Sequence, residues 1–284
     1  MKSLNELLNI GSDILKNAGI ADADNDAWLL LEHVYGLSRA MYYMEPLRQV
    51  NETEYLEKIE IRAQHYPLQY ITGCQWFMGY PFKVNESVLI PRQDTELLVE
   101  CAVSKIKDKD LNVLDMCTGS GCIAISIDKL CRNANVTAAD ISTSALEIAL
   151  YNNDKNGANV RFLESDLFGN IHGKYDIIVS NPPYIPTKVI DSLMPEVKDF
   201  EPVIALDGSD DGLEFYESIT SQSVKHLNNG GMLLYEIGCE QAESVANILE
   251  KNGFKNIAVH KDFAGLDRVV ECRYILSGKD REYV

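Results

Sequence analysis

The fold of this chain is decided by the stretch Tyr175-Asp-Ile-Ile-Val-Ser-Asn-Pro-Pro-Tyr184. Its first six residues are mostly apolar and β-branched, which predicts a buried strand over residues 175–180. The two prolines must end that strand, because proline has no N–H to donate to a sheet ladder. The sequence therefore predicts a stiff, extended turn at the carboxyl end of a strand, where ligands bind in an open α/β sheet.

The turn itself consists of Asn181, Pro182, Pro183 and Tyr184. It offers an amide side chain and an aromatic ring. It also offers main-chain carbonyls that need not accept a hydrogen bond from a neighbouring N–H. The amide oxygen and a main-chain carbonyl could each accept a hydrogen bond from an NH2 group, while the aromatic ring covers the flat face of that group. The turn is therefore a candidate site for a planar group that carries an NH2, and an ordinary Pro-Pro loop is the alternative interpretation.

Composition and charge narrow the class of protein. The chain has 284 residues, of which 46% are hydrophobic and 24% charged, which is typical of a soluble globular protein with one large and one small domain. No apolar run approaches membrane-spanning length, and the first residues lack the layout of a signal peptide, so we expect a cytoplasmic protein away from membranes. A protein with a formal net charge of −17 is poorly suited to bind duplex DNA through the DNA phosphates. The same charge could suit a basic protein partner.

The seven cysteines argue for reduced thiols in the cytosol. They are odd in number and form no CxxC pair. This pattern predicts neither a disulfide framework nor a zinc site, and no other metal site is expected.

Residues 3–75 are predicted to form a small helical bundle. Ser3 and Glu6 make a capping box, and Gly19 and Gly36 suit helix ends. The region has no residue cluster that suggests chemistry, so packing or the docking of a partner is its expected role. The further predicted helices run from Asp24 to Tyr35, from Ser38 onward, and from a cap made by Asn51 with Glu54 to about His65.

The next segment connects this bundle to a second domain. Four aromatic residues between Trp76 and Phe82, with Gly79 and Pro81 as turn residues, predict a β-hairpin. Pro91 is expected to break a strand that begins near residue 87, and Asp94 or Thr95 to start a helix through Glu100. Arg92 lies in the intervening turn, where it could point at an active site or only pair with Asp94 or Glu96.

From residue 112 onward, strand and helix patterns alternate, which is typical of a parallel α/β sheet. The last two strands are expected to close that sheet. The predicted strands are 112–117, 135–140, 160–164, 175–180, 231–238, near 257–260 and 268–276, and the predicted helices are 122–130, 143–156, 211–227 and 241–251.

A second candidate site follows the first of these strands. Gly119-x-Gly121-x-x-Ala124 lets the backbone approach a ligand at a helix N-terminus, and Asp140, at the end of the next strand, could accept both hydroxyls of a ribose. The Asp166 carboxylate could accept a hydrogen bond from the amino group of an adenine, and Leu167 could pack against the face of that base. Together these residues favour adenosine binding, and a βα turn without a ligand is the alternative. An acidic site tolerates the sulfonium of S-adenosylmethionine better than a pyrophosphate, and the turn after residue 180 then favours methyl transfer.

The whole chain resembles the HemK/PrmC family, the glutamine methyltransferases of peptide chain release factors. The Ile-Pro-Arg and Glu-Pro…Ala-Leu-Asp-Gly stretches are more specific than Asn-Pro-Pro-Tyr, which DNA adenine methyltransferases share. The matching motifs are Pro67-Leu-Gln-Tyr-Ile-Thr-Gly73, Val88-Leu-Ile-Pro-Arg92, Asp115-x-x-Thr-Gly-Ser-Gly121, Ser180-Asn-Pro-Pro-Tyr184, Glu201-Pro-x-x-Ala-Leu-Asp-Gly208, Asp211-Gly-Leu213 and Glu236-Ile-Gly238.

The resemblance implies a class I methyltransferase fold, with a Rossmann-like sheet of seven strands whose last strand is antiparallel. It implies a helical substrate-docking domain over residues 1–73, a linking hairpin over 74–90 and a methyltransferase domain over 91–284. The implied cofactor is S-adenosylmethionine, which leaves as S-adenosylhomocysteine, and the implied substrate is the glutamine of the Gly-Gly-Gln loop in class 1 release factors. A monomer that does not bind nucleic acid directly is expected.

The resemblance also distributes roles among site residues. Two positions depart from the family pattern, because Cys117 replaces a usual glycine and Gln93-Asp94 a usual Pro-Glu. The expected catalytic residues are Arg92, Asn181, Pro182, Pro183 and Tyr184, and the expected cofactor residues are Cys117, Thr118, Gly119, Ser120, Gly121, Asp140, Asp166, Leu167 and Asn181.

The expected mechanism addresses the poor nucleophilicity of an amide nitrogen. The Asn181 side-chain oxygen and the Pro182 carbonyl would each accept one N–H of the glutamine amide and favour a pyramidal nitrogen, with Tyr184 over the amide. No general base is required. A ribosomal-protein glutamine methyltransferase and a nucleic-acid adenine methyltransferase are the closest alternatives, and an NAD-dependent oxidoreductase or an adenosine sensor would leave the proline turn unexplained.

Overall fold

The computed structural model describes residues 1–107 and 109–275, and these divide into two compact units. Unit 1 comprises Met1–Cys74 together with the short segment Met194–Phe200. Unit 2 comprises Gln75–Leu193 and the chain from Glu201 onward. In the described ranges, no helix is long and apolar enough to span a membrane.

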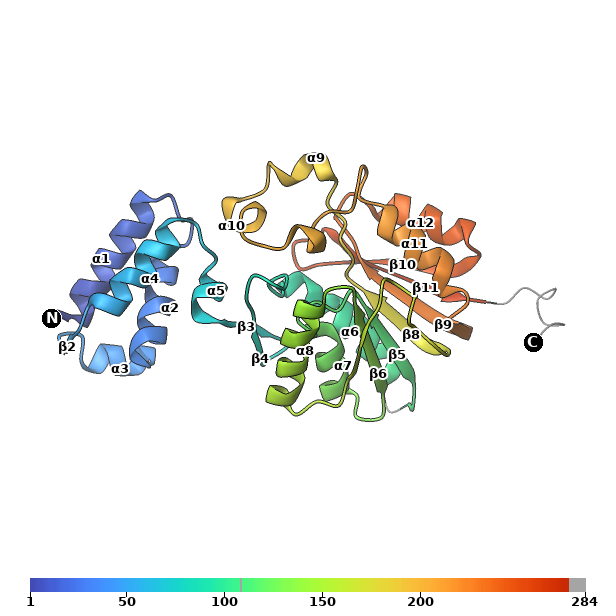
Figure 1. Cartoon of the computed structure of the whole chain (residues 1–284), viewed down its shortest axis with the longest axis horizontal. Coiled ribbons are helices and arrows are strands. Elements are labelled where there is room, and N and C mark those ends of the chain that lie inside the picture. Colours follow the sequence, from blue (N-terminus) through green and yellow to red (C-terminus); the bar gives the residue numbers. More distant parts are fainter. Residues whose placement is uncertain (108, 276–284) are drawn as a thin grey trace. The chain divides into compact units, whose positions relative to one another are not determined.

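Unit 1 is a bundle of helices around a hydrophobic core (Figure 1). Its first helix begins as predicted, because Ser3 Oγ accepts from the backbone N–H of Glu6 and the Glu6 carboxylate accepts from that of Ser3. Leu4, Leu7 and Leu15 bury its apolar face completely. The elements are β1 (Lys2–Ser3), α1 (Leu4–Asn17), α2 (Ala23–Tyr35), α3 (Arg39–Met44), β2 (Gln49–Val50), α4 (Thr53–Ala63), α5 (Leu68–Thr72) and α10 (Pro195–Lys198).

Two details of unit 1 differ from the sequence-based expectation. The predicted cap of the fourth helix at Asn51 is wrong by one residue, because Asn51 Oδ1 accepts from the backbone N–H of Thr53 and Glu52 becomes the N-cap of α4. The region is also not purely helical, since β1 pairs antiparallel with β2.

Polar and aromatic contacts explain why residues 194–200 belong to unit 1. Arg62 is buried, and its guanidinium binds Asp26 at 2.8 Å and Glu196 at 3.1 Å. The Glu196 carboxylate also lies 3.2 Å from Nδ1 of His65, and the Phe200 ring packs edge-on against Tyr66. A segment far along the chain is therefore held by the end of α4.

A short hairpin precedes the main sheet. β3 (Cys74–Phe77) pairs with β4 (Tyr80–Lys83), and the turn consists of Met78 and Gly79, both with positive φ. The expectation that Pro81 belongs to the turn is wrong, because it lies within β4. An edge strand tolerates proline, since one side of its ladder needs no N–H.

Unit 2 contains the predicted seven-stranded sheet, in the order β10-β11-β9-β8-β5-β6-β7. β5 to β9 are parallel, and the last strand of the chain, β11, is antiparallel to both of its neighbours, which confirms the class I methyltransferase fold. The strands are β5 (Asn112–Met116), β6 (Asn135–Asp140), β7 (Arg161–Glu164), β8 (Tyr175–Ser180), β9 (Leu227–Glu236), β10 (Phe254–Lys261) and β11 (Asp267–Tyr274).

Both faces of this sheet are covered by helices (Figure 1). Val113 and Leu114 are neighbours in β5, point to opposite faces and are both fully buried. One core lies against α6 and α7, and the other against α11 and α12. The helices of unit 2 are α6 (Glu96–Ile106), α7 (Cys122–Leu130), α8 (Thr143–Asn156), α9 (Thr187–Ile190), α11 (Glu214–Ser223) and α12 (Ala242–Lys251), with single turns η1 (Gln93–Thr95) and η2 (Val203–Ala205).

Three predicted elements of unit 2 are corrected. The strand expected before Pro91 does not form, because the N–H of Ile90 donates to the Glu201 carboxylate and not to a ladder. The helix expected over 211–227 is shorter, since Gly212 has φ 77° and β9 already begins at Leu227. The last strand ends at Tyr274, and Leu276, its predicted end, lies outside the described residues.

Candidate active site

A cavity of about 430 Å³ opens in unit 2 at the carboxyl ends of the parallel strands. It is lined by most of the residues that the sequence singled out for cofactor and substrate. Of the predicted site residues, Gly121, Pro182 and Tyr184 are not part of the lining. Those that line it are Arg92, Cys117, Thr118, Gly119, Ser120, Asp140, Asp166, Leu167, Asn181 and Pro183.

Strand register brings these residues together. Met116 at the end of β5 is in register with Ala139 of β6 on one side and with Ser180 of β8 on the other. β7 continues the row, with Glu164 paired to Asp140. The residues that follow each strand therefore meet at one edge of the sheet, as is usual for ligand sites in parallel α/β folds.

The glycine turn after β5 has two distinct glycine roles. Gly119 has φ 55° and open space where a Cβ would be, so a ligand could approach its backbone closely. Gly121 has φ 80°, and a Cβ there would lie 3.0 Å from the Ile125 side chain and 3.1 Å from that of Ala149. The second glycine therefore allows α7 and α8 to pack closely, which explains why it does not line the cavity.

Asp140 is tied to the glycine turn by its carboxylate. Oδ2 accepts from the backbone N–H of Gly119 at 2.8 Å, and Oδ1 accepts from that of Ser142 at 2.9 Å. Burial raises the pKa of Asp140, although these backbone hydrogen bonds oppose the shift. Each carboxylate oxygen can accept more than one hydrogen bond, so Asp140 retains capacity for hydroxyl groups in the cavity.

Asp115 braces the same turn from inside the protein, a role that sequence reasoning missed. Its buried Oδ2 accepts from the Thr118 hydroxyl at 2.6 Å and from the backbone N–H of Ala124 at 3.2 Å. Burial raises the pKa of Asp115 to about 7, against these two hydrogen bonds. Its sequence signal is an acidic residue inside an otherwise apolar strand.

The residues after β7 form a tight turn that presents Leu167 to the cavity. The Ser165 hydroxyl donates to the Leu167 carbonyl at 2.6 Å, and the Ser165 N–H donates to the Asp140 carbonyl at 2.9 Å. Leu167 itself has φ 44°, and Asp166 is exposed at the rim. The predicted pair of adenine contacts therefore lies beside the predicted ribose acceptor.

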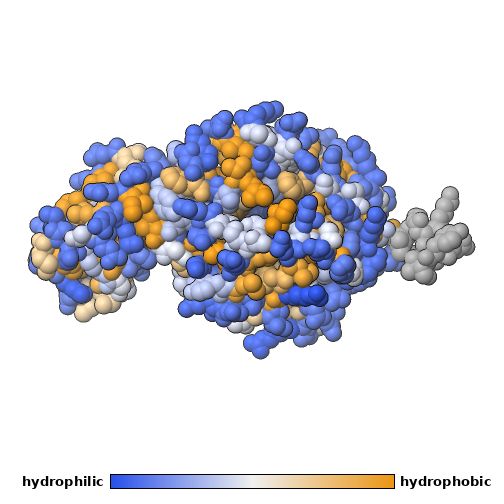
Figure 2. Space-filling model, in the orientation of Figure 1, coloured by the Kyte–Doolittle hydropathy of each residue, from blue (hydrophilic) through white to orange (hydrophobic). Residues whose placement is uncertain are grey.

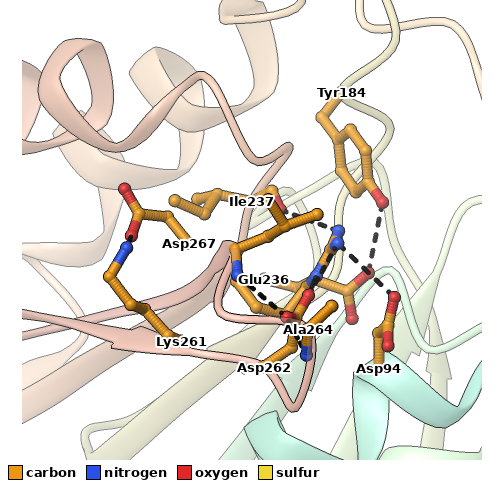
Figure 3. A network of polar contacts seen from close by, with 10 residues as sticks. Asp94, Tyr184, Glu236, Ile237, Lys261, Asp262, Ala264 and Asp267 are labelled. Carbon is orange, nitrogen blue, oxygen red and sulfur yellow. Dashed lines mark hydrogen bonds and ion pairs between the residues drawn. The ribbon is translucent and has the colours of Figure 1, made fainter.

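The Asn-Pro-Pro-Tyr turn is held at its two ends. The Asn181 side-chain Nδ2–H donates to Thr95 Oγ1 at 3.4 Å, and the Tyr184 hydroxyl donates to Glu236 Oε1 at 3.2 Å (Figure 3). Gly208 packs so closely that a Cβ there would lie 2.8 Å from the Tyr184 Cα. The turn is thus fixed by contacts from three separate parts of the chain.

Arg92 lines the cavity, but its predicted partners are wrong. Its guanidinium binds the carboxylate of Glu201, which is 4% exposed. Asp94 lies 3.4 Å from Arg268 instead, and the Glu96 carboxylate accepts from the backbone N–H of Met78. Glu201 begins the specific Glu-Pro stretch noted in the sequence, and no local pattern indicated its pairing.

Several lining residues were not predicted from the sequence. They are Ser87, Val88, Leu89, Pro91, Thr95, Met116, Cys122, Ile123, Ile141, Ser142, Ala145, Ser165, Pro202, Ile204, Ala205, Glu214, Phe215 and Ser218.

Family models match two parts of the chain. Residues 92–195 match the methyltransferase small domain, and residues 6–73 match the PrmC N-terminal domain. The chain is 40% identical over 279 residues to a release factor glutamine methyltransferase of Clostridium botulinum, covering 95% of this chain and 99% of that protein. It is 42% identical over 256 residues to the Clostridium acetobutylicum protein of the same name, covering 86% and 89%.

Solved structures of other proteins share the fold of unit 2. A methyltransferase from Pyrococcus furiosus aligns with a TM-score of 0.54 at 19% identity, covering 70% of this chain and 91% of that one. A Thermus thermophilus 16S rRNA methyltransferase, solved with AdoMet and guanosine, aligns with a TM-score of 0.52 at 16% identity, covering 71% and 49%. At these identities the likeness concerns the fold alone.

Proposed function

The chain belongs to the family of release factor glutamine methyltransferases, and we propose that it methylates the side-chain amide nitrogen of the glutamine in the Gly-Gly-Gln motif of class 1 peptide chain release factors. The observation that carries this proposal is the cavity, which unites the glycine turn, Asp140 and Asn181 of the Asn-Pro-Pro-Tyr turn. The residues proposed to bind the nucleoside of the cofactor (the nucleoside half) and those proposed to bind the substrate amide (the amide half) therefore line the same cavity.

The cofactor of this reaction is S-adenosylmethionine, which supplies the methyl group when it is bound. The cavity volume of about 430 Å³ lies within the range of roughly 300–1,000 Å³ that is usual for small-molecule sites. Asp140 would accept the ribose hydroxyls, the Gly119 backbone would allow close approach, and Leu167 would cover the adenine. The two acidic side chains, Asp140 and Asp166, suit a positively charged ligand.

The amide half would orient the substrate nitrogen. The Nδ2 of Asn181 is already engaged with Thr95, which leaves Oδ1 free to accept one N–H of the glutamine amide. The Pro182 carbonyl would accept the other N–H; Pro182 itself does not line the cavity, but it lies between Asn181 and Pro183, which both do. Two acceptors in one turn would favour a pyramidal nitrogen with a free lone pair, which would lower the barrier by positioning and by stabilising the developing positive charge.

Tyr184 takes a different role from the one that its sequence position suggested. Its hydroxyl binds Glu236 and the residue does not line the cavity, so it would hold the turn and not cover the substrate amide. Gln241 supports this role, since its Nε2 donates to the Tyr184 carbonyl at 3.0 Å.

A protein loop suits the rim of the cavity better than a nucleic acid does. Ile141 and Ile204 line the cavity and are 50% and 57% exposed, so part of its edge is apolar. Figure 2 shows hydrophilic residues over much of the visible surface, interrupted by hydrophobic patches. Together with the net charge of −17, this surface disfavours a phosphate backbone. We place the reaction in the cytoplasm, where release factors act, and we propose that residues 1–73 dock the factor.

The test is methylation of candidate substrates by the purified protein with S-adenosylmethionine, read by peptide mass spectrometry. We expect one added methyl group on the Gly-Gly-Gln peptide of a class 1 release factor, and none on a factor in which that glutamine is replaced by alanine. A ribosomal-protein mixture and an adenine-containing DNA form the comparison arms. Methylation of either comparison substrate with no modification of the release factor would overturn the proposal.

A further inference from the structure

Asn152 is a fully buried asparagine on α8 that the proposed mechanism does not use. Its side chain makes three hydrogen bonds, all of them to backbone atoms. Oδ1 accepts from the N–H of Lys83 at 2.7 Å, and Nδ2 donates to the carbonyl of Lys83 at 3.1 Å and to that of Ser120 at 2.9 Å. The orientation of the amide is therefore fixed, because a rotation by half a turn would place its NH2 group against an N–H and its oxygen against two carbonyls.

The two backbone partners of Asn152 belong to different parts of unit 2. Lys83 is the last residue of β4, in the hairpin, and the Asn152 amide binds both its N–H and its carbonyl, as a neighbouring strand would. Ser120 lies between the two glycines of the turn after β5, and it lines the cavity. One side chain therefore joins the hairpin to the turn that is proposed to receive the cofactor.

The contact with Ser120 acts on a peptide group that is also held at its other end. The Ser120 carbonyl belongs to the same peptide group as the N–H of Gly121, and this N–H donates to the Thr118 carbonyl at 2.9 Å. Because a peptide group is planar, the two hydrogen bonds together fix its orientation. Without Asn152, the carbonyl of the buried Ser120 would lose this partner, and the turn that includes Gly119 would be free to shift.

Asn156 provides an internal comparison, since it lies one helical turn further along α8. Its Nδ2 donates to the Pro81 carbonyl of the same hairpin at 3.0 Å and to the backbone carbonyl of Asn152 at 3.0 Å. Within the part of the chain that the structure describes, Asn156 makes no hydrogen bond to the glycine turn. The two asparagines therefore share the hairpin and differ in their contact with Ser120.

We propose that Asn152 is a positioning residue for the cofactor, which holds the Ser120 carbonyl and so keeps the glycine turn in the conformation that receives S-adenosylmethionine. The hairpin supports this role, because the Lys83 backbone fixes the orientation of the amide. The inference rests on the proposed function, since it takes the glycine turn as part of the cofactor site. Asn152 does not line the cavity, and it acts only through the backbone of the turn.

The test compares Asn152→Ala with Asn156→Ala, because both variants remove an amide that binds the hairpin. Titration calorimetry measures the affinity for S-adenosylmethionine, and urea unfolding measures the stability of each variant. We expect Asn152→Ala to weaken cofactor affinity about tenfold, the factor that corresponds to one lost hydrogen bond, and Asn156→Ala to weaken it less than about threefold. A loss of affinity in Asn152→Ala no larger than in Asn156→Ala would overturn the proposal, since a merely structural role would affect stability alone.

A measurement on the wild-type protein keeps the proposal testable if Asn152→Ala fails to fold. NMR of the ¹⁵N-labelled protein should show slow proton exchange at the Asn152 side-chain NH2 group. The signals of this group should shift when S-adenosylmethionine is added, and those of the Asn156 NH2 group should not. Asn152 signals that stay unchanged at saturating cofactor would overturn the proposal.

These measurements use no protein substrate, so they separate this inference from the proposed function. A wild type that binds S-adenosylmethionine but leaves release factors unmethylated would contradict the proposed function. The comparison of Asn152→Ala with Asn156→Ala would still decide the role of Asn152 in that case.

Discussion

The backbone N–H of Gly119 donates to Oδ2 of Asp140 at 2.8 Å, so the glycine turn after β5 and the acid that ends β6 form one structural unit. This contact joins the Gly119 backbone, which a cofactor could approach closely, to the carboxylate that we propose accepts the ribose hydroxyls. A substitution of Asp140 should therefore affect both the position of the Gly119 backbone and the binding of the ribose hydroxyls.

Asp140→Ala should weaken binding of S-adenosylmethionine by about tenfold to a hundredfold, because a charge-assisted acceptor is worth roughly 1.5–3 kcal/mol. Asp140→Asn should lie between the wild type and Ala, since it keeps one oxygen acceptor. Titration calorimetry measures the affinities. Asp154→Ala, at an exposed position on α8, is the matched control for the change in net charge. Equal affinity of wild type and Asp140→Ala would remove Asp140 from the site.

The backbone at Cys117 gives a second prediction. Cys117 has φ 63°, in the left-handed region that favours glycine. Cys117→Gly should therefore be more stable than Cys117→Ala by about 1 kcal/mol, although both variants lose the same thiol. Chemical unfolding of the two variants compares them directly. An alanine variant as stable as the glycine variant would show that the turn relaxes out of this conformation.

The sequence predicted the sheet well because its strands carry local signals. Residues 175–180 are apolar, and the prolines that follow end the strand at Ser180, as the structure shows. The site residues that were missed have their partners far along the chain. Thr95 meets Asn181, Glu201 meets Arg92, and Glu236 meets Tyr184 only after the sheet has formed. A single long-range hydrogen bond leaves no periodic pattern, so sequence reasoning could find the ends of the strands but not the side chains that brace them.

The elevated pKa of Asp115 predicts a pH dependence of stability. This pKa rises from its ordinary 3.8 to about 7 on folding, so the folded protein holds the proton more tightly than the unfolded chain. The stabilising contribution is fully present below about pH 4 and is lost as the pH rises through about 7. Relative to Asp115→Asn, the wild type should lose up to a few kcal/mol of unfolding free energy over that range.

Urea unfolding at several pH values measures this difference. Asp154→Asn, which changes an exposed carboxylate, should follow the wild-type pH dependence. Parallel curves for the wild type and Asp115→Asn would mean that Asp115 titrates normally in the folded protein.

The buried ion pairs of Arg62 predict a large effect in unit 1. Arg62→Ala leaves the Asp26 carboxylate buried without its partner and takes one partner from Glu196, which keeps its contact with His65; the change should cost about 3–5 kcal/mol. Trp28 fluorescence in a Trp76→Phe background reports unfolding of this unit alone, because the chain has 2 tryptophans. Arg48→Ala, at an exposed position, is the control. A loss no larger than that of the control would show that the Arg62 contacts contribute little.

Asn181 gives the most direct test of the chemistry. Asn181→Ala should lower turnover by about 10²–10³ and leave cofactor affinity nearly unchanged, because Asn181 is proposed to act on the substrate nitrogen in the transition state. Asn181→Asp keeps an acceptor oxygen but removes the NH2 that donates to Thr95 Oγ1 at 3.4 Å. The aspartate can no longer donate to Thr95, so its oxygens would lose the orientation that the amide has. We therefore expect Asp to fail nearly as badly as Ala, when both are measured on a release factor at saturating cofactor. Substantial activity of Asn181→Asp would mean that hydrogen-bond acceptance alone is sufficient, and wild-type turnover in Asn181→Ala would contradict the mechanism itself.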